Sequence, residues 1–255
     1  MHLTVVPVVA KKEEAEFELF DAVMDSLNSK LNLQNGDVLV ISSKYVSQAQ
    51  GRVISLYETS PSTEGVSLSK KYKMKPKIAE IVLRESDFIF GGIAGFVIAS
   101  ADGIMAPNAG IDKSNAKDGT IILYPKNPYQ TAEELRRKIF LDQMVHVGII
   151  FVDSRLMPAR VGTTGVAIAC AGIEPVKDMR AKKDLNGSPL KVTFQAVVDN
   201  LASIANHEMG EGAESKPIAI VRNSGAKLTH RRINPEEMAI SHDQCVYMRG
   251  LNANN

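Results

Sequence analysis

The fold is decided by two apolar runs, VLVI at residues 38–41 and VGIIFV at residues 147–152. Each run is short enough to be a strand that is buried on both faces of a sheet. Polar residues follow directly, SSK (42–44) after the first run and DS (153–154) after the second. Ligand sites in α/β sheets often form at the carboxyl ends of strands. We therefore expect these polar residues to lie at a cleft.

The rest of the chain alternates between helical and strand-like patterns. Helices are predicted at residues 13–31, 78–83, 131–144 and 193–209. Further strands are predicted at residues 2–9, 51–57, 120–124 and 217–221, a β-meander at 87–106 and a polar loop at 59–66. This order favours α+β or α/β over a regular βαβ array. We take the fold class as α+β, with mixed sheets and flanking helices.

Composition excludes several classes of protein. The 255 residues carry 30 Lys and Arg against 29 Asp and Glu, and 44% of them are apolar. That balance is not typical of disordered chains or of general nucleic-acid binders. Two cysteines cannot form a disulfide framework. No apolar run has membrane length and the N-terminus lacks a signal-peptide pattern, so we expect a cytoplasmic protein with no membrane partner.

The chain is long enough for one large domain or two smaller ones. We predict a single unit over residues 1–255, with two subdomains as the alternative and a boundary near the glycine-dense stretch 91–110. The segment 87–106 is also apolar and punctuated by glycine. Because such segments often pair across subunits, we predict a homodimer.

The usual nucleotide-binding motifs are absent. The chain has no G-x-x-x-x-G-K-[ST] loop, no G-x-G-x-x-G after a strand and no G-x-S-x-G elbow. Any nucleotide site must therefore be of a different kind, without a P-loop. His230, His242 and Cys245 lack the spacing of a zinc site.

Three acidic segments are candidates for metal-assisted chemistry. Asp112 lies in NAGIDKSN (108–115), Asp153 follows the apolar run 147–152, and Glu211 lies in MGEG (209–212) after a predicted helix. Hard cations such as Mg²⁺ take oxygen ligands from carboxylates and phosphates. Taken one by one, each has a plainer interpretation. Asp112 could form an Asx turn, Asp153 could accept hydrogen bonds from backbone N–H groups, and Glu211 could be an exposed loop residue.

Two basic segments have a similar pair of interpretations. Residues 177–187 hold four positive charges within seven positions and could receive an anionic substrate. Residues 70–77 carry a second group of lysines around a proline. A solvated surface is the favoured interpretation of both.

Taken together, these segments resemble the coenzyme F420-0:gamma-glutamyl ligase family. The resemblance runs from about residue 33 to residue 222, and NAGID-x-SN is its most specific piece. The segments that carry it are GDVLVISSKYVSQAQGR (36–52), NAGIDKSN (108–115), VGIIFVDS (147–154), GVAIACAG (165–172), KDMRAKKDLNGSPL (177–190) and HEMGEGAESKPIAIVR (207–222).

The resemblance implies a fold and a reaction. It implies a non-P-loop α+β architecture that forms an intertwined homodimer. The implied enzyme joins L-glutamate to the lactyl-phosphate side chain of a deazaflavin precursor, cleaves GTP to GDP and phosphate, and can add a second glutamate through a gamma linkage. It implies Mg²⁺ or Mn²⁺, with two divalent sites, and K⁺ as a further cation.

The resemblance also implies roles for individual residues. Asp112, Asp153 and Glu211 match catalytic metal ligands, and Ser154 stands where a metal-associated Thr is usual. The implied nucleotide contacts are Ser43, Lys44, Asn115, Met209, Gly210, Gly212 and Lys216. A divalent cation held by the three acids would screen the repulsion between a triphosphate and an acceptor carboxylate.

This chain also departs from the family pattern. The family's S-K-A-E-G-R is here SQAQGR (47–52), so a lysine is replaced by Gln48, and its D-T-x-G-R is here DSRLM (153–157). The family's opening pattern is missing, and Val9 leads directly into AKKEEAE (10–16). We expect Arg155 or Arg160 to compensate for the lost lysine, the alternative being that Arg155 points to solvent. A different amide ligase and a non-catalytic binding homologue remain rival functions.

Overall fold

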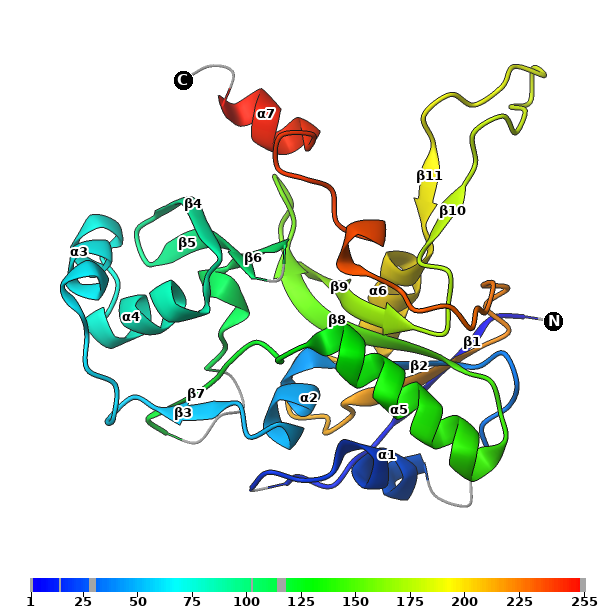
Figure 1. Cartoon of the computed structure of the whole chain (residues 1–255), viewed down its shortest axis with the longest axis horizontal. Coiled ribbons are helices and arrows are strands. Elements are labelled where there is room, and N and C mark those ends of the chain that lie inside the picture. The colour runs from blue at the N-terminus through cyan, green and yellow to red at the C-terminus, as the bar shows by residue number, and fades with distance from the viewer. Residues whose placement is uncertain (1, 14, 28–30, 102, 114–117, 253–255) are drawn as a thin grey trace.

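A computed structural model of the chain describes residues 2–13, 15–27, 31–101, 103–113 and 118–252. Its core is a five-stranded sheet in the order β1-β12-β2-β8-β9. These strands are β1 (Thr4–Val8), β12 (Ile218–Arg222), β2 (Val38–Ser42), β8 (Gly148–Leu156) and β9 (Thr163–Ala171). The α+β class is confirmed, with mixed sheets and helices packed around them (Figure 1).

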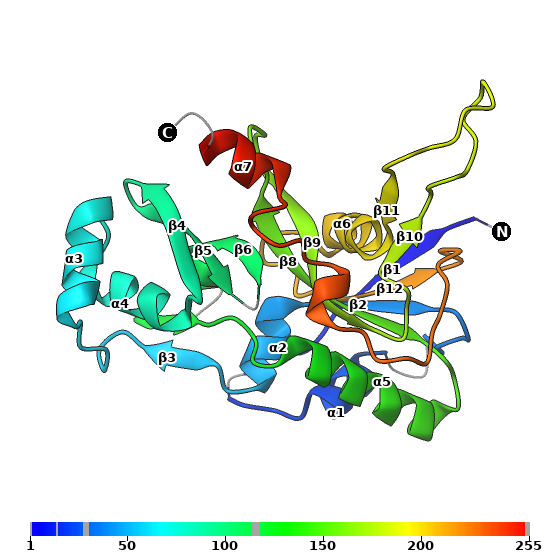
Figure 2. The same cartoon turned by 45° about the horizontal axis from the view of Figure 1, so that its top comes forward.

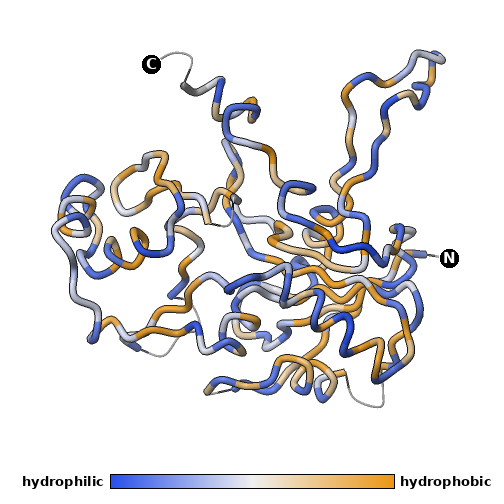
Figure 3. The backbone as a smooth tube through the Cα atoms, viewed as in Figure 1, coloured by the Kyte–Doolittle hydropathy of each residue, from blue (hydrophilic) through white to orange (hydrophobic). Residues whose placement is uncertain are grey.

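The two apolar runs that decide the fold lie side by side in this sheet. β2 and β8 pair in parallel, and their register joins Ser42 to Val152. All other pairings in the sheet are antiparallel. Because this part of both strands is covered on both faces, residues 38–41 and 148–152 are all non-polar and buried, and Figure 3 shows this centre in orange.

Helices cover both faces of the sheet. α5 (Pro128–Gln143) and α1 (Leu19–Leu27) lie on one face and α6 (Val197–Met209) lies on the other (Figures 1 and 2). The short helix α2 (Ser43–Ala49) follows β2 directly. The carboxyl end of β2 therefore leads into a helix at the same edge where β8 reaches Val152.

A second lobe is inserted between α2 and α5 and has its own hydrophobic cluster, which includes Ile81, Val97 and Ile121. It contains a three-stranded antiparallel meander, confirming that prediction, a two-stranded ribbon and two helices. Its elements are β3 (Val53–Ser55), α3 (Thr63–Tyr72), α4 (Pro76–Glu85), β4 (Phe88–Ile93), β5 (Phe96–Ala101), β6 (Ile104–Pro107), the 3₁₀ turn η1 (Asn108–Gly110) and β7 (Thr120–Ile122). The division into subdomains near residues 91–110 stays a prediction.

The remaining elements are a two-stranded ribbon and the C-terminal segment. β10 (Val176–Asp178) and β11 (Phe194–Ala196) pair as a ribbon whose connecting loop projects from the body (Figure 1). The C-terminal segment carries η2 (Pro235–Glu237) and α7 (Val246–Asn252). Among the described residues, no helix is both long enough and apolar enough to cross a membrane.

Three sequence predictions of secondary structure were wrong in part. The helix expected at 13–31 begins only at Leu19, because the preceding chain runs beside residue 215, with the Ala10 N–H donating to the Ser215 carbonyl at 2.9 Å. The loop expected at 59–66 contains the start of α3, which Ser62 caps by accepting from the Gly65 N–H. The helix expected from residue 193 begins at Val197, because residues 194–196 pair with β10.

Candidate functional site

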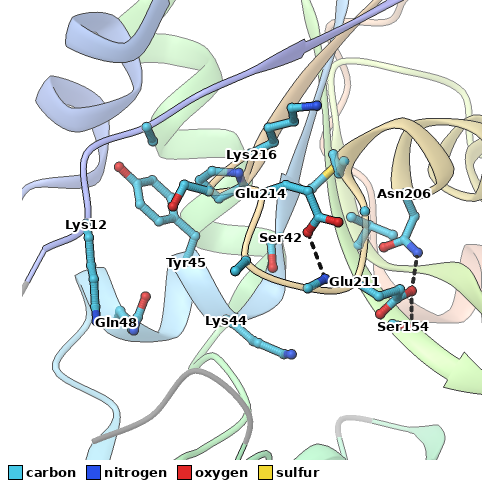
Figure 4. Close-up of a pocket in the computed structure, with 18 of the residues that line it drawn as sticks. Lys12, Ser42, Lys44, Tyr45, Gln48, Ser154, Asn206, Glu211, Glu214 and Lys216 are labelled. Atoms are coloured by element: carbon cyan, nitrogen blue, oxygen red, sulfur yellow. Dashed lines mark hydrogen bonds between the residues drawn. The ribbon is translucent and has the colours of Figure 1, made fainter.

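A pocket of about 320 Å³ opens where β2 and β8 stop pairing (Figure 4). Parallel strands bring their carboxyl ends to one edge of a sheet, which explains why two segments 110 residues apart in sequence meet here. The loop after α6 and the segment before α1 complete the lining. The lining residues used below are Lys12, Lys44, Tyr45, Gln48, Asp153, Ser154, Asn206, Met209, Gly210, Glu211, Gly212, Glu214 and Lys216.

Asp153 does not end its strand, contrary to expectation. β8 continues to Leu156 because β9 keeps pairing with it after β2 has turned into α2. Successive side chains of a strand point to opposite faces of the sheet. Asp153 therefore points toward α2 and Ser154 toward the loop after α6, and each finds different partners.

Both oxygens of the Asp153 carboxylate are engaged. Oδ1 accepts from the Ser43 hydroxyl at 3.0 Å, and Oδ2 accepts from Arg155 Nε at 2.9 Å. Arg155 is only 4% exposed, so the expectation that it could point to solvent is wrong. Its Nη1 donates to the Met105 carbonyl of the second lobe at 2.7 Å, and its Nη2 has no hydrogen-bond partner in the described part of the chain.

Glu211 lies at the same edge, on the loop after α6. Its Oε1 accepts from the Ser154 hydroxyl at 2.7 Å and from Asn206 Nδ2 at 2.8 Å, with Thr163 further away at 3.4 Å. Gly210 ends α6 with φ +81°, a conformation that favours glycine. That turn directs Glu211 back toward β8.

The same loop holds a second carboxylate. Glu214 accepts from the Gly212 N–H at 2.8 Å, as Figure 4 shows. Backbone N–H groups of glycine-rich loops are common anion sites. The carboxylate of Glu214 thus accepts a hydrogen bond from the Gly212 N–H, a donor that could also bind a phosphate oxygen.

Asp112 contacts a residue of the pocket lining, Lys44, from the second lobe. Its backbone exchanges two hydrogen bonds of 2.9 Å with Ile122, and its carboxylate forms an ion pair with Lys44 Nζ at 2.7 Å. Lys44 lies in the first turn of α2, so this pair joins the two lobes. Asn115, a predicted nucleotide contact, lies outside the described residues.

The predicted metal ligands are engaged by other groups of the protein. Within the described ranges, no three His, Cys, Asp or Glu side chains lie close enough together to hold a metal ion. The oxygen donors have the right chemistry for Mg²⁺ or Mn²⁺, but Asp112, Asp153 and Glu211 each bind a different set of protein groups. The residues as arranged therefore do not fit a metal, and their role as metal ligands stays a prediction.

The predicted nucleotide contacts divide into two groups. Lys44, Gly210, Gly212 and Lys216 line the pocket. Ser43 is buried against Asp153, and Met209, although part of the lining, packs into the main hydrophobic cluster.

Two residues of the pocket lining, Lys12 and Tyr45, were missed in the sequence, whereas Lys216 was predicted as a nucleotide contact. Lys12 lies beside Gln48 (Figure 4), and among the described residues neither Lys12 nor Lys216 has an ion pair or a side-chain hydrogen bond. Tyr45 packs against Phe17 with ring centroids 4.9 Å apart, and burial raises the pKa of its phenol. No motif marks the segment around Lys12. It lies at the start of the chain, where the family's opening pattern is missing.

A second departure from the family pattern has a structural explanation. Gln50 Nε2 donates to the Lys126 carbonyl at 2.9 Å, and its Oε1 accepts from the Lys126 N–H at 2.8 Å. An amide can donate and accept at once, whereas a carboxylate only accepts. Gln50 therefore ties α2 to the start of α5.

The basic segments lie away from the pocket lining. Arg180 forms an ion pair with Asp178 at 2.7 Å on the projecting β10–β11 arm. Lys77 donates to the Leu56 carbonyl at 2.7 Å in the second lobe.

Comparisons with known proteins give the family. The family model described as F420-0:Gamma-glutamyl ligase matches residues 6–223. A coenzyme F420:L-glutamate ligase of Methanopyrus kandleri is 37% identical over 203 residues, covering 79% of this chain and 81% of that protein. Proteins of the same name from Methanocaldococcus jannaschii and Archaeoglobus fulgidus are 37% and 34% identical over the same shares. The chain belongs to the F420-0:gamma-glutamyl ligase family.

Proposed function

We propose that this protein is a GTP-dependent ligase that joins L-glutamate to the deazaflavin coenzyme F420-0, and then adds a second glutamate through a gamma linkage. The observation that carries the proposal is the pocket at the ends of β2 and β8, which is lined by Asp153, Glu211 and the glycine loop at residues 210–212. Relatives named coenzyme F420:L-glutamate ligase support the choice of substrates.

The chemistry requires an activated carboxylate, because a carboxylate and an amine do not condense at a useful rate. In the proposed reaction, a carboxylate oxygen of the deazaflavin side chain attacks the γ-phosphorus of GTP, and GDP leaves. The glutamate amine then attacks the carbonyl carbon of the acyl phosphate. Inorganic phosphate leaves, and the amine proton passes to a base that we do not assign.

The described residues suit the binding of polyphosphate. Lys12, Lys44 and Lys216 place positive charge around the pocket, and Gly212 offers a backbone N–H. Fixed charges of this kind stabilise the charge that develops during phosphoryl transfer. Arg155 stays behind Asp153 and acts on its position.

Cations complete the proposal as cofactors, with GTP as the co-substrate. We propose Mg²⁺ or Mn²⁺, with K⁺ as a further cation, on the family resemblance alone. Because the described residues do not assemble three acids at one point, we route no step of the reaction through the metal.

The proposed quaternary state is a homodimer. The meander β4–β6 leaves Phe88, Ile93, Phe96 and Ile98 exposed, which is unusual for a surface that stays in water. Light scattering should give about twice the chain mass of 27.7 kDa. A Phe96→Asp variant should shift the mass toward one chain, and an unchanged mass in that variant would place the interface elsewhere.

A different nucleotide-dependent amide ligase is the second candidate, and one observation favours it. Lys12 and Gln48 form a pocket wall that departs from the family pattern in both segments. A changed wall could select another nucleotide or another acceptor, so ATP and GTP are compared in the same assay. The cytoplasmic location and the absence of nucleic-acid partners stay predictions.

One assay tests the proposal directly. Purified protein is incubated with GTP, L-glutamate, F420-0 and Mn²⁺, and phosphate release and product mass are measured together. We expect phosphate and a product heavier by one glutamyl residue only when both acceptor and glutamate are present. Phosphate release without either substrate, or a different acceptor requirement, would contradict the proposed reaction.

A further inference from the structure

Helix α6 carries a polar stripe toward the edge strand β9. Asp199, Ser203 and Asn206 are spaced by four and three residues, so their side chains leave the helix on one face. The residues that bury the helix form a separate apolar stripe and pack into the main hydrophobic cluster: Val198, Leu201, Ala202, Ala205 and Met209. The polar stripe is therefore not what buries α6, and its contacts serve another purpose.

Asp199 holds an irregularity in β9. The pairing of β8 with β9 shifts by one residue at Ile168, which has no partner in the register. Beside this bulge, the Ala167 N–H donates to Asp199 Oδ1 at 3.0 Å, from the first turn of α6. On β8, the residues opposite the bulge are Val152 and Asp153, with which the strand enters the pocket lining. The first turn of α6 is thus tied to β9 at the level of the pocket.

Two further contacts hold the middle of α6. The hydroxyls of Ser203 and Thr164 lie 2.9 Å apart and share a hydrogen bond. Gly165 lets the helix approach closely, because a Cβ there would lie 2.7 Å from the Ala202 carbonyl oxygen and 2.6 Å from Asn206 Cβ. Hydrogen bonds weaken steeply with distance and angle. These contacts therefore fix the position of α6 along β9, which apolar packing alone specifies less strictly.

The end of α6 carries this position into the pocket. Asn206 Nδ2 donates to Glu211 Oε1 at 2.8 Å, and the Gly210 N–H donates to the Asn206 carbonyl at 3.1 Å. Ser154 of β8 donates to the same Glu211 oxygen at 2.7 Å. Glu211 is therefore held between one helix residue and one strand residue. A slip of α6 by one residue is about 1.5 Å along its axis, enough to separate these two donors.

We propose that Asp199 and Ser203 are positioning residues that set where Glu211 lies in the pocket. Neither residue lines the pocket, so both act through the position of α6 on β9. The use of Glu211 by the reaction rests on the proposed function. Because Lys12 and Lys44 reach the pocket from other elements, loss of either contact should lower kcat more than it changes the KM for nucleotide.

Ser203→Ala is the first test, because it removes one hydroxyl from a partly buried position. We expect kcat to fall about tenfold with the KM for nucleotide changed less than about twofold, since a small displacement of an active-site group has an effect of this size. Asn200→Ala is the matched control, a polar-to-alanine change at an exposed position of the same helix. We expect no change of kcat in the control.

Asp199 is tested with a pair of variants. Asp199→Leu removes the acceptor and should lower kcat as Ser203→Ala does. Asp199→Asn should keep the kcat of the unmodified chain, because an amide oxygen can still accept from the Ala167 N–H. Circular dichroism first establishes that Asp199→Leu folds, and Ser203→Ala decides the question if it does not. A kcat that falls equally in Asp199→Asn and Asp199→Leu would overturn the role of this hydrogen bond.

Glu211→Gln separates positioning from a general loss of stability. If Ser203 acts through Glu211, then Ser203→Ala should lower kcat less than about twofold in the Glu211→Gln background, against about tenfold in the unmodified chain. An equal fall in both backgrounds, an unchanged kcat in Ser203→Ala, or an equal fall in Asn200→Ala would overturn the proposal.

Hydrogen–deuterium exchange of the full chain, without substrates, gives a readout that does not depend on turnover. We expect the amides of residues 206–210 to exchange about tenfold faster in Ser203→Ala and to be unchanged in Asn200→Ala, because local opening follows the contacts that are lost. Unchanged exchange in Ser203→Ala would overturn the proposal. A protein without ligase turnover that shows the faster exchange refutes the proposed function alone. An active ligase whose kcat and exchange are both unaffected by Ser203→Ala refutes only this inference.

Discussion

The two walls of the pocket differ in how their charges are satisfied. The acidic wall, defined by Asp153, Ser154 and Glu211, is held by hydrogen bonds and an ion pair to neighbouring side chains. The lysine wall, defined by Lys12 and Lys216, has no such partners among the described residues. One wall is therefore fixed by contacts within the protein, while the other keeps its charge available for an anionic ligand.

Among the changes considered, removing the charge of Asp112 or Asp153 should have the largest effect on turnover. We expect Asp112→Asn and Asp153→Asn each to lower kcat about 10³-fold, because loss of a major electrostatic group in an active site has that size. Activity is measured as glutamate-dependent phosphate release. Near-normal turnover in either variant, with metal still required, would contradict the assignment of these residues.

The same two variants should differ in stability. Asp153→Asn leaves Arg155 buried without its counter-ion, so we expect the free energy of unfolding to fall by about 3 kcal/mol while the fold is kept. Asp112 is 34% exposed, and its loss should change stability by less than about 1 kcal/mol. Urea unfolding of both variants checks this order, and equal losses would show that the Arg155 pair is not a buried one in solution.

Glu211→Gln tests the acidic wall without removing its hydrogen-bond acceptor. The amide oxygen can still accept from Ser154 and Asn206, so only the charge is lost. We expect kcat to fall about 10²-fold with little change in thermal stability. Full activity would show that the charge of Glu211 is not used.

The sequence predicts those parts of the site that are marked by a local hydrophobic pattern or by a motif. The apolar runs that became β2 and β8 are visible because strands buried on both faces must be apolar, and their polar followers meet because parallel strands share an edge. The acidic residues and the glycine loop are visible because they form motifs. These elements place most of the pocket.

The remaining features depend on contacts between distant segments. Arg155 stands among polar and loop-like residues in the sequence, and only the pairing of β8 with β9 and the Met105 carbonyl bury it. Lys12 lies just before the helix predicted at residues 13–31, in a segment whose Ala10 N–H donates to the Ser215 carbonyl. The start of α3 was missed for the same reason, because Ser62 is fixed by Glu80, 18 residues later.

Lys12→Met tests the lysine wall and should have a smaller effect than any change above. We expect the KM for nucleotide to rise about fivefold with kcat unchanged, because a partly exposed charge contributes about 1 kcal/mol to binding. Lys138→Met, which removes the same charge from a surface ion pair with Glu18, is the control for the loss of one positive charge. A fall in kcat with KM unchanged would assign Lys12 a role in the chemical step and not in binding.

The smallest expected effect comes from returning a lysine to position 48. The compensation that the sequence suggested for Gln48 was Arg155 or Arg160, but Arg155 is buried behind Asp153 and Arg160 is exposed on the turn after β8. Lys12 lies beside Gln48 and can supply the charge from the facing segment. Two ammonium groups placed together repel each other, so Gln48→Lys alone should change the KM for nucleotide less than about twofold. In the Lys12→Met background the repulsion is gone, and Gln48→Lys should recover about half of the lost binding free energy. If Gln48→Lys has the same effect in both backgrounds, the two positions do not share one phosphate-binding role.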